Sequence, residues 1–348
     1  MATALPASVR SRVISLYVLL LGANVAAWIW ALVAFDRHPV LLGTALLAYA
    51  FGLRHAADAD HIAAIDNVTR KLMQQGKRPA AVGLFFSLGH STVVFGLSVV
   101  IALTSVAIKN HFASFASVGG VIGTMISAFF LLAIALANVL VLASVYQTFQ
   151  HVKRGGRFKD ESLNLILAKR GFFGRVFRGL FQLIEHGWQM YLVGFLFGLG
   201  FDTATEVGLL GISATEATQG LPIWSILVFP TLFTAGMALI DSTVGILMLS
   251  AYGWAFVKPI RKLYYNLIIT LVSVAVALLV GGIEVLGLIG DRFKIHGTIW
   301  NWISTLNHNF GVVGFAIIGV FVVSWVVSIL FYRLNRYDEI EVNVDPVR

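Results

Sequence analysis

The chain has 348 residues, of which 58% are hydrophobic and 12% are charged, and its formal net charge is +8. Soluble domains average about 25% charged residues, so this composition excludes an ordinary soluble protein and predicts an all-α, polytopic helical membrane protein. Cysteine is absent, which excludes a disulfide framework and thiolate metal sites.

Eight apolar runs are long enough to cross a hydrocarbon core of about 30 Å, which takes about 20 helical residues. They cover residues 13–35, 40–65, 80–104, 118–146, 187–211, 223–250, 264–289 and 310–332. We expect each run to form one transmembrane helix. No small-residue cleavage site stands out after the first run, so we expect it to be a retained span and not a signal peptide.

The basic residues gather on one side of these spans. Most of the 25 Lys and Arg residues precede the first span, follow the last, or lie between the second and third, fourth and fifth, and sixth and seventh. Arg70 and Lys71 are counted among them. Because cytoplasmic segments collect Lys and Arg, both termini are predicted to be cytoplasmic, in a multi-pass protein of the cell membrane. A positive charge in this position reflects orientation and does not indicate nucleic-acid binding.

The longest connection divides the chain. We predict a first four-span half at 1–146, a basic cytoplasmic loop at 147–186, a second four-span half at 187–332 and a cytoplasmic tail at 333–348. Apolar residues recur at helical spacing within the loop. This pattern fits either an amphipathic helix on the membrane surface or a short soluble linker helix.

The second run carries the most unusual stretch, Arg54 to Asn67, which places several ionisable side chains inside a predicted span. Charged groups at bilayer depth are rare unless they pair or bind an ion, so such a run marks a functional site. Two histidines and two carboxylates within seven residues offer nitrogen and oxygen donors without thiolate. This donor set suits a borderline divalent transition metal.

The spacing in this stretch also predicts an irregular helix. In a regular helix Arg54, Asp58 and His61 share one face, whereas Asp60 points to nearly the opposite side. If Asp60 and both histidines hold one ion, the helix must be broken near residues 57–60, as in transporters with ion sites at mid-membrane. The alternative is that Arg54 pairs with Asp58 and the histidines bond neighbouring helices.

Other polar side chains lie inside predicted spans. His90 is near the middle of the third, and Asp241 is near the middle of the sixth. Asp202 and Glu206 are four residues apart on the fifth, where two like charges repel unless a cation or proton intervenes. These positions are candidates for ion contact or for helix pairing, and Asn138 and Glu284 are weaker candidates.

Four segments resemble the signatures of the nickel/cobalt transporter family of multi-spanning permeases. They are RHAADADHI at 54–62, with an H-x4-D-H core, FSLGHSTVV at 86–94, LGFDTATE at 199–206 and GMALIDST at 236–243. The resemblance extends over nearly the whole chain. It departs at Val244, where the family pattern has an acidic residue.

The resemblance implies a metal-binding set and a pathway. The set comprises His55, Asp60 and His61, with Asp58 and His90. The pathway or supporting positions are Arg54, Asp66, Asp202, Glu206 and Asp241.

The implied function is uptake of Ni²⁺ or Co²⁺, the transported substrate and not a cofactor, through a permease that lies in the lipid bilayer. The chain lacks the G-x4-G-K-[ST] phosphate loop, and nothing in the sequence implies an ATP-binding subunit. Two alternatives are an efflux permease and an intramembrane metal-dependent enzyme. The enzyme lacks support because no H-E-x-x-H motif is present.

Overall fold

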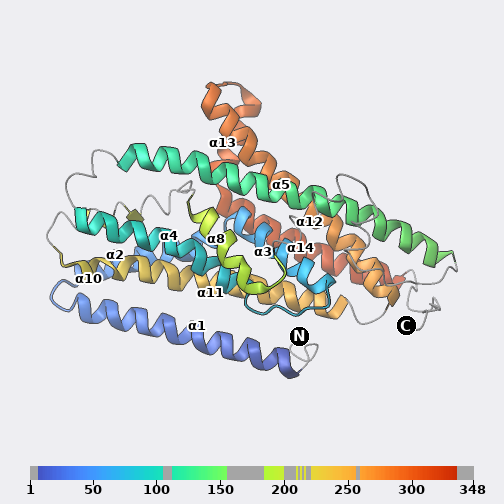
Figure 1. Ribbon diagram of the computed structural model, residues 1–348, viewed down its shortest axis with the longest axis horizontal. Coiled ribbons are helices and arrows are strands. Elements are labelled where there is room, and N and C mark those ends of the chain that lie inside the picture. Colours follow the sequence, from blue (N-terminus) through green and yellow to red (C-terminus); the bar gives the residue numbers. More distant parts are fainter. Residues whose placement is uncertain are drawn as a thin grey trace.

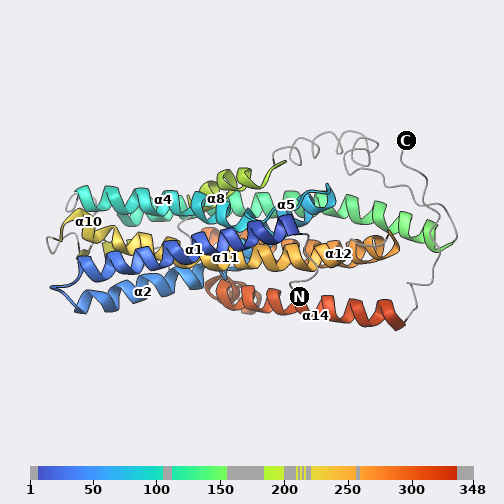
Figure 2. The same ribbon diagram turned by 90° about the horizontal axis from the view of Figure 1, so that it is seen from below.

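The computed structural model of the protein describes residues 7–104, 112–154, 184–199, 221–255 and 259–334, together with 209–210, 212–213 and 215–216. Every regular element in this part of the chain is a helix, which confirms the all-α prediction. The helices lie side by side in an elongated bundle (Figures 1 and 2).

The elements follow the chain as α1 (Ala7–Ala34), α2 (Val40–His55), α3 (Ala59–Gln74), α4 (Val82–Thr104), α5 (Phe112–Lys153), the 3-10 turn η2 (Gly187–Gln189), α8 (Met190–Gly198), α10 (Ile223–Ile226), α11 (Val228–Ala255), α12 (Pro259–Phe293), α13 (Thr298–His308) and α14 (Phe310–Leu334). Each predicted apolar run corresponds to one or two of these elements. Part of the fifth run lies outside the described residues.

Five segments of the described chain are long and apolar enough to cross a membrane, namely Ser8–Ala34, Val82–Val100, Ile223–Gly253, Leu267–Phe293 and Val312–Tyr332. The bent pair α2 and α3 can supply a sixth. The chain is therefore a multi-pass membrane protein. The count of eight spans stays a prediction, as does the cytoplasmic placement of the termini. The first turn of α1 and the last turn of α14 do lie toward the same end of the bundle (Figure 1).

Helix α3 lies at the centre of the bundle, where it contacts α4, α5, α11, α12 and α14. Every residue from Ala59 to Met73 is buried. The second span was predicted to end at residue 65, but α3 continues to Gln74. Arg70 and Lys71, counted above as loop residues, are therefore buried side chains of a central helix.

Glycines allow the helices around α2 and α3 to touch backbone to backbone. A methyl group at Gly52 would overlap the carbonyl of Phe233 on α11, and one at Gly314 on α14 would overlap the carbonyl of Ala57. Small residues at helix contacts are the usual means of close packing in lipid. These contacts hold α11 and α14 directly against the segment that carries the polar motif.

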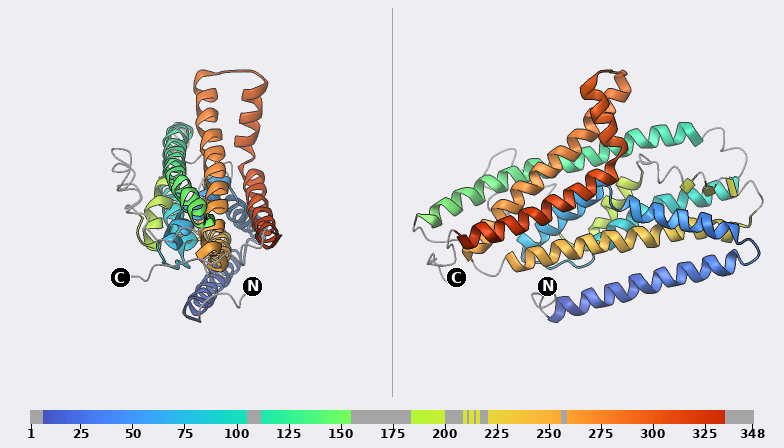
Figure 3. Two further views of the ribbon diagram at one scale, coloured as in Figure 1. Left: turned by 90° about the vertical axis from the view of Figure 1, so that its right-hand side faces the viewer. Right: turned by 180° about the vertical axis from the view of Figure 1, so that it is seen from behind.

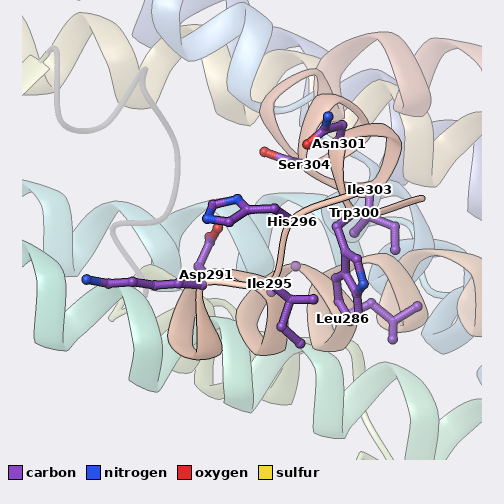
Figure 4. A pocket seen from close by; sticks show the side chains of 11 residues that line it. Leu286, Asp291, Ile295, His296, Trp300, Asn301, Ile303 and Ser304 are labelled. Carbon is purple, nitrogen blue, oxygen red and sulfur yellow. The ribbon is translucent and has the colours of Figure 1, made fainter. Parts of the chain in front are cut away.

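Helix α13 was not anticipated from the sequence. It has 11 residues, too few to cross a membrane, and it folds back beside the end of α12 to form a hairpin that protrudes from the bundle (Figure 3). A cavity of about 290 Å³ lies inside this hairpin, and Asp291, His296 and Trp300 are among its lining residues (Figure 4). His296 is exposed, and Lys294 also lines the cavity. We assign no metal site there.

The division into two four-span halves stays a prediction. Helix α5 continues to Lys153, past the expected boundary at residue 146. Most of the basic loop, including the expected interfacial helix, lies outside the described residues.

Candidate metal centre

The polar motif lies at a break between α2 and α3. The two helices meet at an angle of 51°, and the break consists of residues 56–58. The break is closed by two tight-turn hydrogen bonds, from Ala57 N to Arg54 O (3.0 Å) and from Asp58 N to His55 O (2.9 Å). The expectation of an irregular helix near residues 57–60 is confirmed.

Three histidines from three helices meet beside this break. His55 ends α2, His61 lies in the first turn of α3, and His90 comes from α4. One ligand nitrogen from each lies within 4.8 Å of the other two, and all three side chains are buried. The Nε2 atoms of His55 and His90 are 3.0 Å apart, so one ring can donate a hydrogen bond to the other when no ion is present.

Two carboxylates orient two of these rings. Asp58, the N-cap residue of α3, lies 3.1 Å from Nδ1 of His55. Asp241 of α11 lies 3.3 Å from Nδ1 of His61. In both pairs the carboxylate contacts Nδ1 and leaves Nε2 available, an arrangement that fixes the ring orientation in protein metal sites.

Buried polar atoms remain without a hydrogen-bond partner at this place. They are Nε2 of His61 and Oδ1 of Asp60, each without a partner among the described residues. Nearly all buried polar atoms in proteins have hydrogen-bond partners, so these two atoms are candidates to bind a cation. Asp60 is not part of the three-histidine cluster, but it interacts electrostatically with Asp58 and His55.

Apolar rings close the site on two sides. Phe86 of α4 meets the His61 ring edge-on at 4.7 Å between centroids, and Phe233 of α11 lies 5.6 Å from the His55 ring. In a buried, apolar surrounding, electrostatic attraction between the donor atoms and a cation is weakly screened. The arrangement combines three imidazoles and three nearby carboxylates, all of them buried.

The structure separates several other residues of the predicted set from this cluster. Arg54 is exposed, and the alternative in which it pairs with Asp58 is not observed, because Asp58 contacts His55 instead. Asp66 is fully buried farther along α3 and bonds other residues. Asp202 and Glu206 lie outside the described residues. Their roles stay predictions.

Asp241 has a more specific position than the sequence indicated. It was predicted as a pathway residue, and its pairing with His61 joins positions 180 residues apart, which no local signal reveals. Val244, where the family pattern has an acid, is buried in the apolar core. In this chain α11 therefore offers one carboxylate at the centre.

Comparison with known proteins identifies the family. The model of a family described as high-affinity nickel-transport protein matches residues 41–331. The chain belongs to this nickel-transport family. It is therefore a transporter and not an enzyme, as the sequence analysis expected, and the resemblance noted there is confirmed.

Relatives within the family include both nickel and cobalt transporters. The chain is 60% identical to a high-affinity nickel transport protein of Cupriavidus necator, over 96% of this chain and 95% of the relative. It is 40% identical to the nickel transporter NixA of Staphylococcus aureus, over 92% and 94% of the two chains. It is 37% identical to the cobalt transport protein NhlF of Rhodococcus rhodochrous, over 85% and 84%. No solved structure matches the chain.

The pairing of Asp241 with His61 gives a first prediction for this family member. Asp241→Ala should weaken metal binding by about 10- to 100-fold, because partners that orient ligands typically contribute this much. Asp241→Asn should lose less, since its amide oxygen can still accept the hydrogen bond from Nδ1. Titration of the purified variants with nickel measures both effects. Equal losses in the two variants would mean that the carboxylate itself binds the ion.

Proposed function

We propose that the protein is a high-affinity permease that carries Ni²⁺, and also Co²⁺, into the cell across the cytoplasmic membrane without ATP. The single observation that carries this proposal is the buried cluster of His55, His61 and His90 beside the α2–α3 break. The relatives, which include nickel and cobalt transporters, support it.

In this proposal each side chain has a distinct role. The rings of His55, His61 and His90 bind the ion, while Asp58 holds the His55 ring and Asp241 holds the His61 ring in a fixed orientation. The unpartnered oxygen of Asp60 is the candidate for an additional ligand. The carboxylates also offset the charge of a divalent cation, which would otherwise be costly to bury.

The donor set suits nickel and cobalt. Imidazole nitrogens together with carboxylate oxygens bind borderline divalent ions. The relatives transport nickel or cobalt.

The membrane potential is a sufficient energy source. A divalent cation that enters the cell gains about 4.6 kcal/mol per 100 mV, enough for roughly a thousandfold accumulation. The efflux alternative predicts the opposite direction of net movement. Its weakness is that the nine histidines of this chain are scattered and form no histidine-rich loop.

Competition in cells tests this function. Cells that express the protein should accumulate radioactive nickel from trace concentrations, and excess unlabelled cobalt should inhibit this uptake more strongly than equal zinc or manganese. Depolarising the membrane should lower the accumulation, whereas depleting ATP at constant potential should not. Expressing cells that retain less nickel than control cells would support the efflux alternative.

A further inference from the structure

A second polar cluster lies on α3, beyond the metal centre. Its most unusual member is Arg70, which is only 1% exposed. The guanidinium donates hydrogen bonds to Oδ1 of Asn67 (3.0 Å) and to Oγ1 of Thr270 (3.3 Å). Its Nε has no hydrogen-bond partner among the described residues. Within the described residues, the hydrogen bonds of this buried charged group therefore go to neutral partners only.

Asp66 is the carboxylate nearest to this guanidinium along the helix, and it is fully buried. It accepts hydrogen bonds from the hydroxyl of Tyr252 on α11 and from Oγ of Ser273 on α12 (2.6 Å). It interacts electrostatically with Arg70, but no salt bridge joins the two. The carboxylate and the guanidinium are therefore close without being fully paired.

The cluster is placed along the route from the metal centre to one end of the bundle. At about 1.5 Å per residue, Asp66 lies about 7.5 Å and Arg70 about 13.5 Å beyond His61 along the α3 axis. In Figure 1, α3 runs from the break toward the end of the bundle where α5 and α14 finish. The distribution of basic residues predicts this end to be cytoplasmic.

A purely structural role explains these contacts poorly. Burying a charge is costly, and a direct, well-bonded partner is needed to offset the cost. Arg70 has no such partner within the described chain, although Asp66 is one helical turn away. Ionisable groups inside membrane proteins are rare, and they commonly mark ion pathways.

We propose that Asp66, with the hydroxyls of Tyr252 and Ser273, is a transit site for the divalent cation, and that Arg70 closes this site whenever no metal ion occupies it. This inference rests on the proposed function. The guanidinium acts as a tethered cation that an arriving metal ion must displace from the field of Asp66. Oxygen donors bind these metals more weakly than imidazoles do, so the ion can leave toward the cytoplasm.

Neutral variants separate this role from a structural one. Arg70→Met removes the charge at similar volume, and Asp66→Asn/Arg70→Met removes both charges. If the pair is only structural, the double variant should regain stability and nickel uptake together. If the transit site is real, the double variant should fold and bind nickel at the metal centre, yet its uptake should stay at least about tenfold below wild type.

A labelling experiment tests the closure directly, since the chain contains no cysteine. Ser273→Cys should react slowly with a membrane-impermeant methanethiosulfonate in inside-out vesicles. Adding Arg70→Met should raise this rate at least about tenfold, and adding Arg70→Lys should not, because Lys keeps the charge. Equal rates in all three backgrounds would overturn the proposal. If Arg70→Met does not fold, the double variant replaces it in the same comparison.

Nickel binding by the purified wild type distinguishes failure of the proposed function from failure of the transit site. A wild-type protein that neither binds nor carries nickel refutes the proposed function. A wild type that does both, beside an Asp66→Asn/Arg70→Met double variant with normal uptake, refutes the transit site alone.

Discussion

Replacement of His55, His61 or His90 by alanine, one at a time, is expected to abolish saturable nickel uptake while the protein still reaches the membrane. Each variant removes one of three converging nitrogens, so the affinity loss should exceed the roughly 100-fold upper range for partners that only orient a ligand. Uptake at trace nickel and binding by the purified variants measure this loss. Protein amount in the membrane fraction must be measured in parallel.

His38→Ala is the matched control for these variants. His38 is exposed between α1 and α2, and it should therefore tolerate the same substitution with uptake unchanged. If the three cluster variants bind nickel normally but are lost from the membrane, the histidines serve packing and the metal centre is wrongly assigned. His61→Ala is the most informative of the three, because its Nε2 has no partner within the described residues.

Much of the candidate metal centre could be predicted from the sequence because its signals are local. The H-x4-D-H spacing identified His55 and His61, and the mismatch of Asp60 with a regular helical face indicated the break that the structure shows at residues 56–58. Apolar length also located most helices. It could not reveal α13, whose 11 residues are too short for a span.

The contacts that complete the site are long-range and leave no such local signal. His55 meets His90 across 35 positions, and His61 meets Asp241 across 180. The count of basic residues predicts on which side of the membrane a segment lies, and this prediction stays untested. The count says nothing about which basic side chains are buried. Lys71, for example, was counted as a loop residue, yet its Nζ bonds the carbonyl of Ile184 at 2.7 Å inside the bundle.

Gly314→Ala is expected to have an effect comparable to the loss of a metal ligand, although Gly314 bears no polar group. A methyl group there would overlap the carbonyl oxygen of Ala57, in the middle of the α2–α3 break. The backbone of Ala57 cannot move aside as a flexible side chain can. The loss of folding free energy should therefore reach or exceed the roughly 1–3 kcal/mol typical of overpacking. Thermal unfolding and nickel binding of the purified variant measure the effect.

Gly319→Ala on the same helix provides the comparison that isolates this overlap. Nothing lies within 4 Å of a methyl group built at Gly319. Both substitutions gain about 1 kcal/mol of helix propensity, so Gly319→Ala should be neutral or slightly stabilising. If Gly314→Ala behaves in the same way, α14 does not press against Ala57. If it lowers nickel affinity while Gly319→Ala does not, then α14 fixes the break and, through it, the position of His55 against His90.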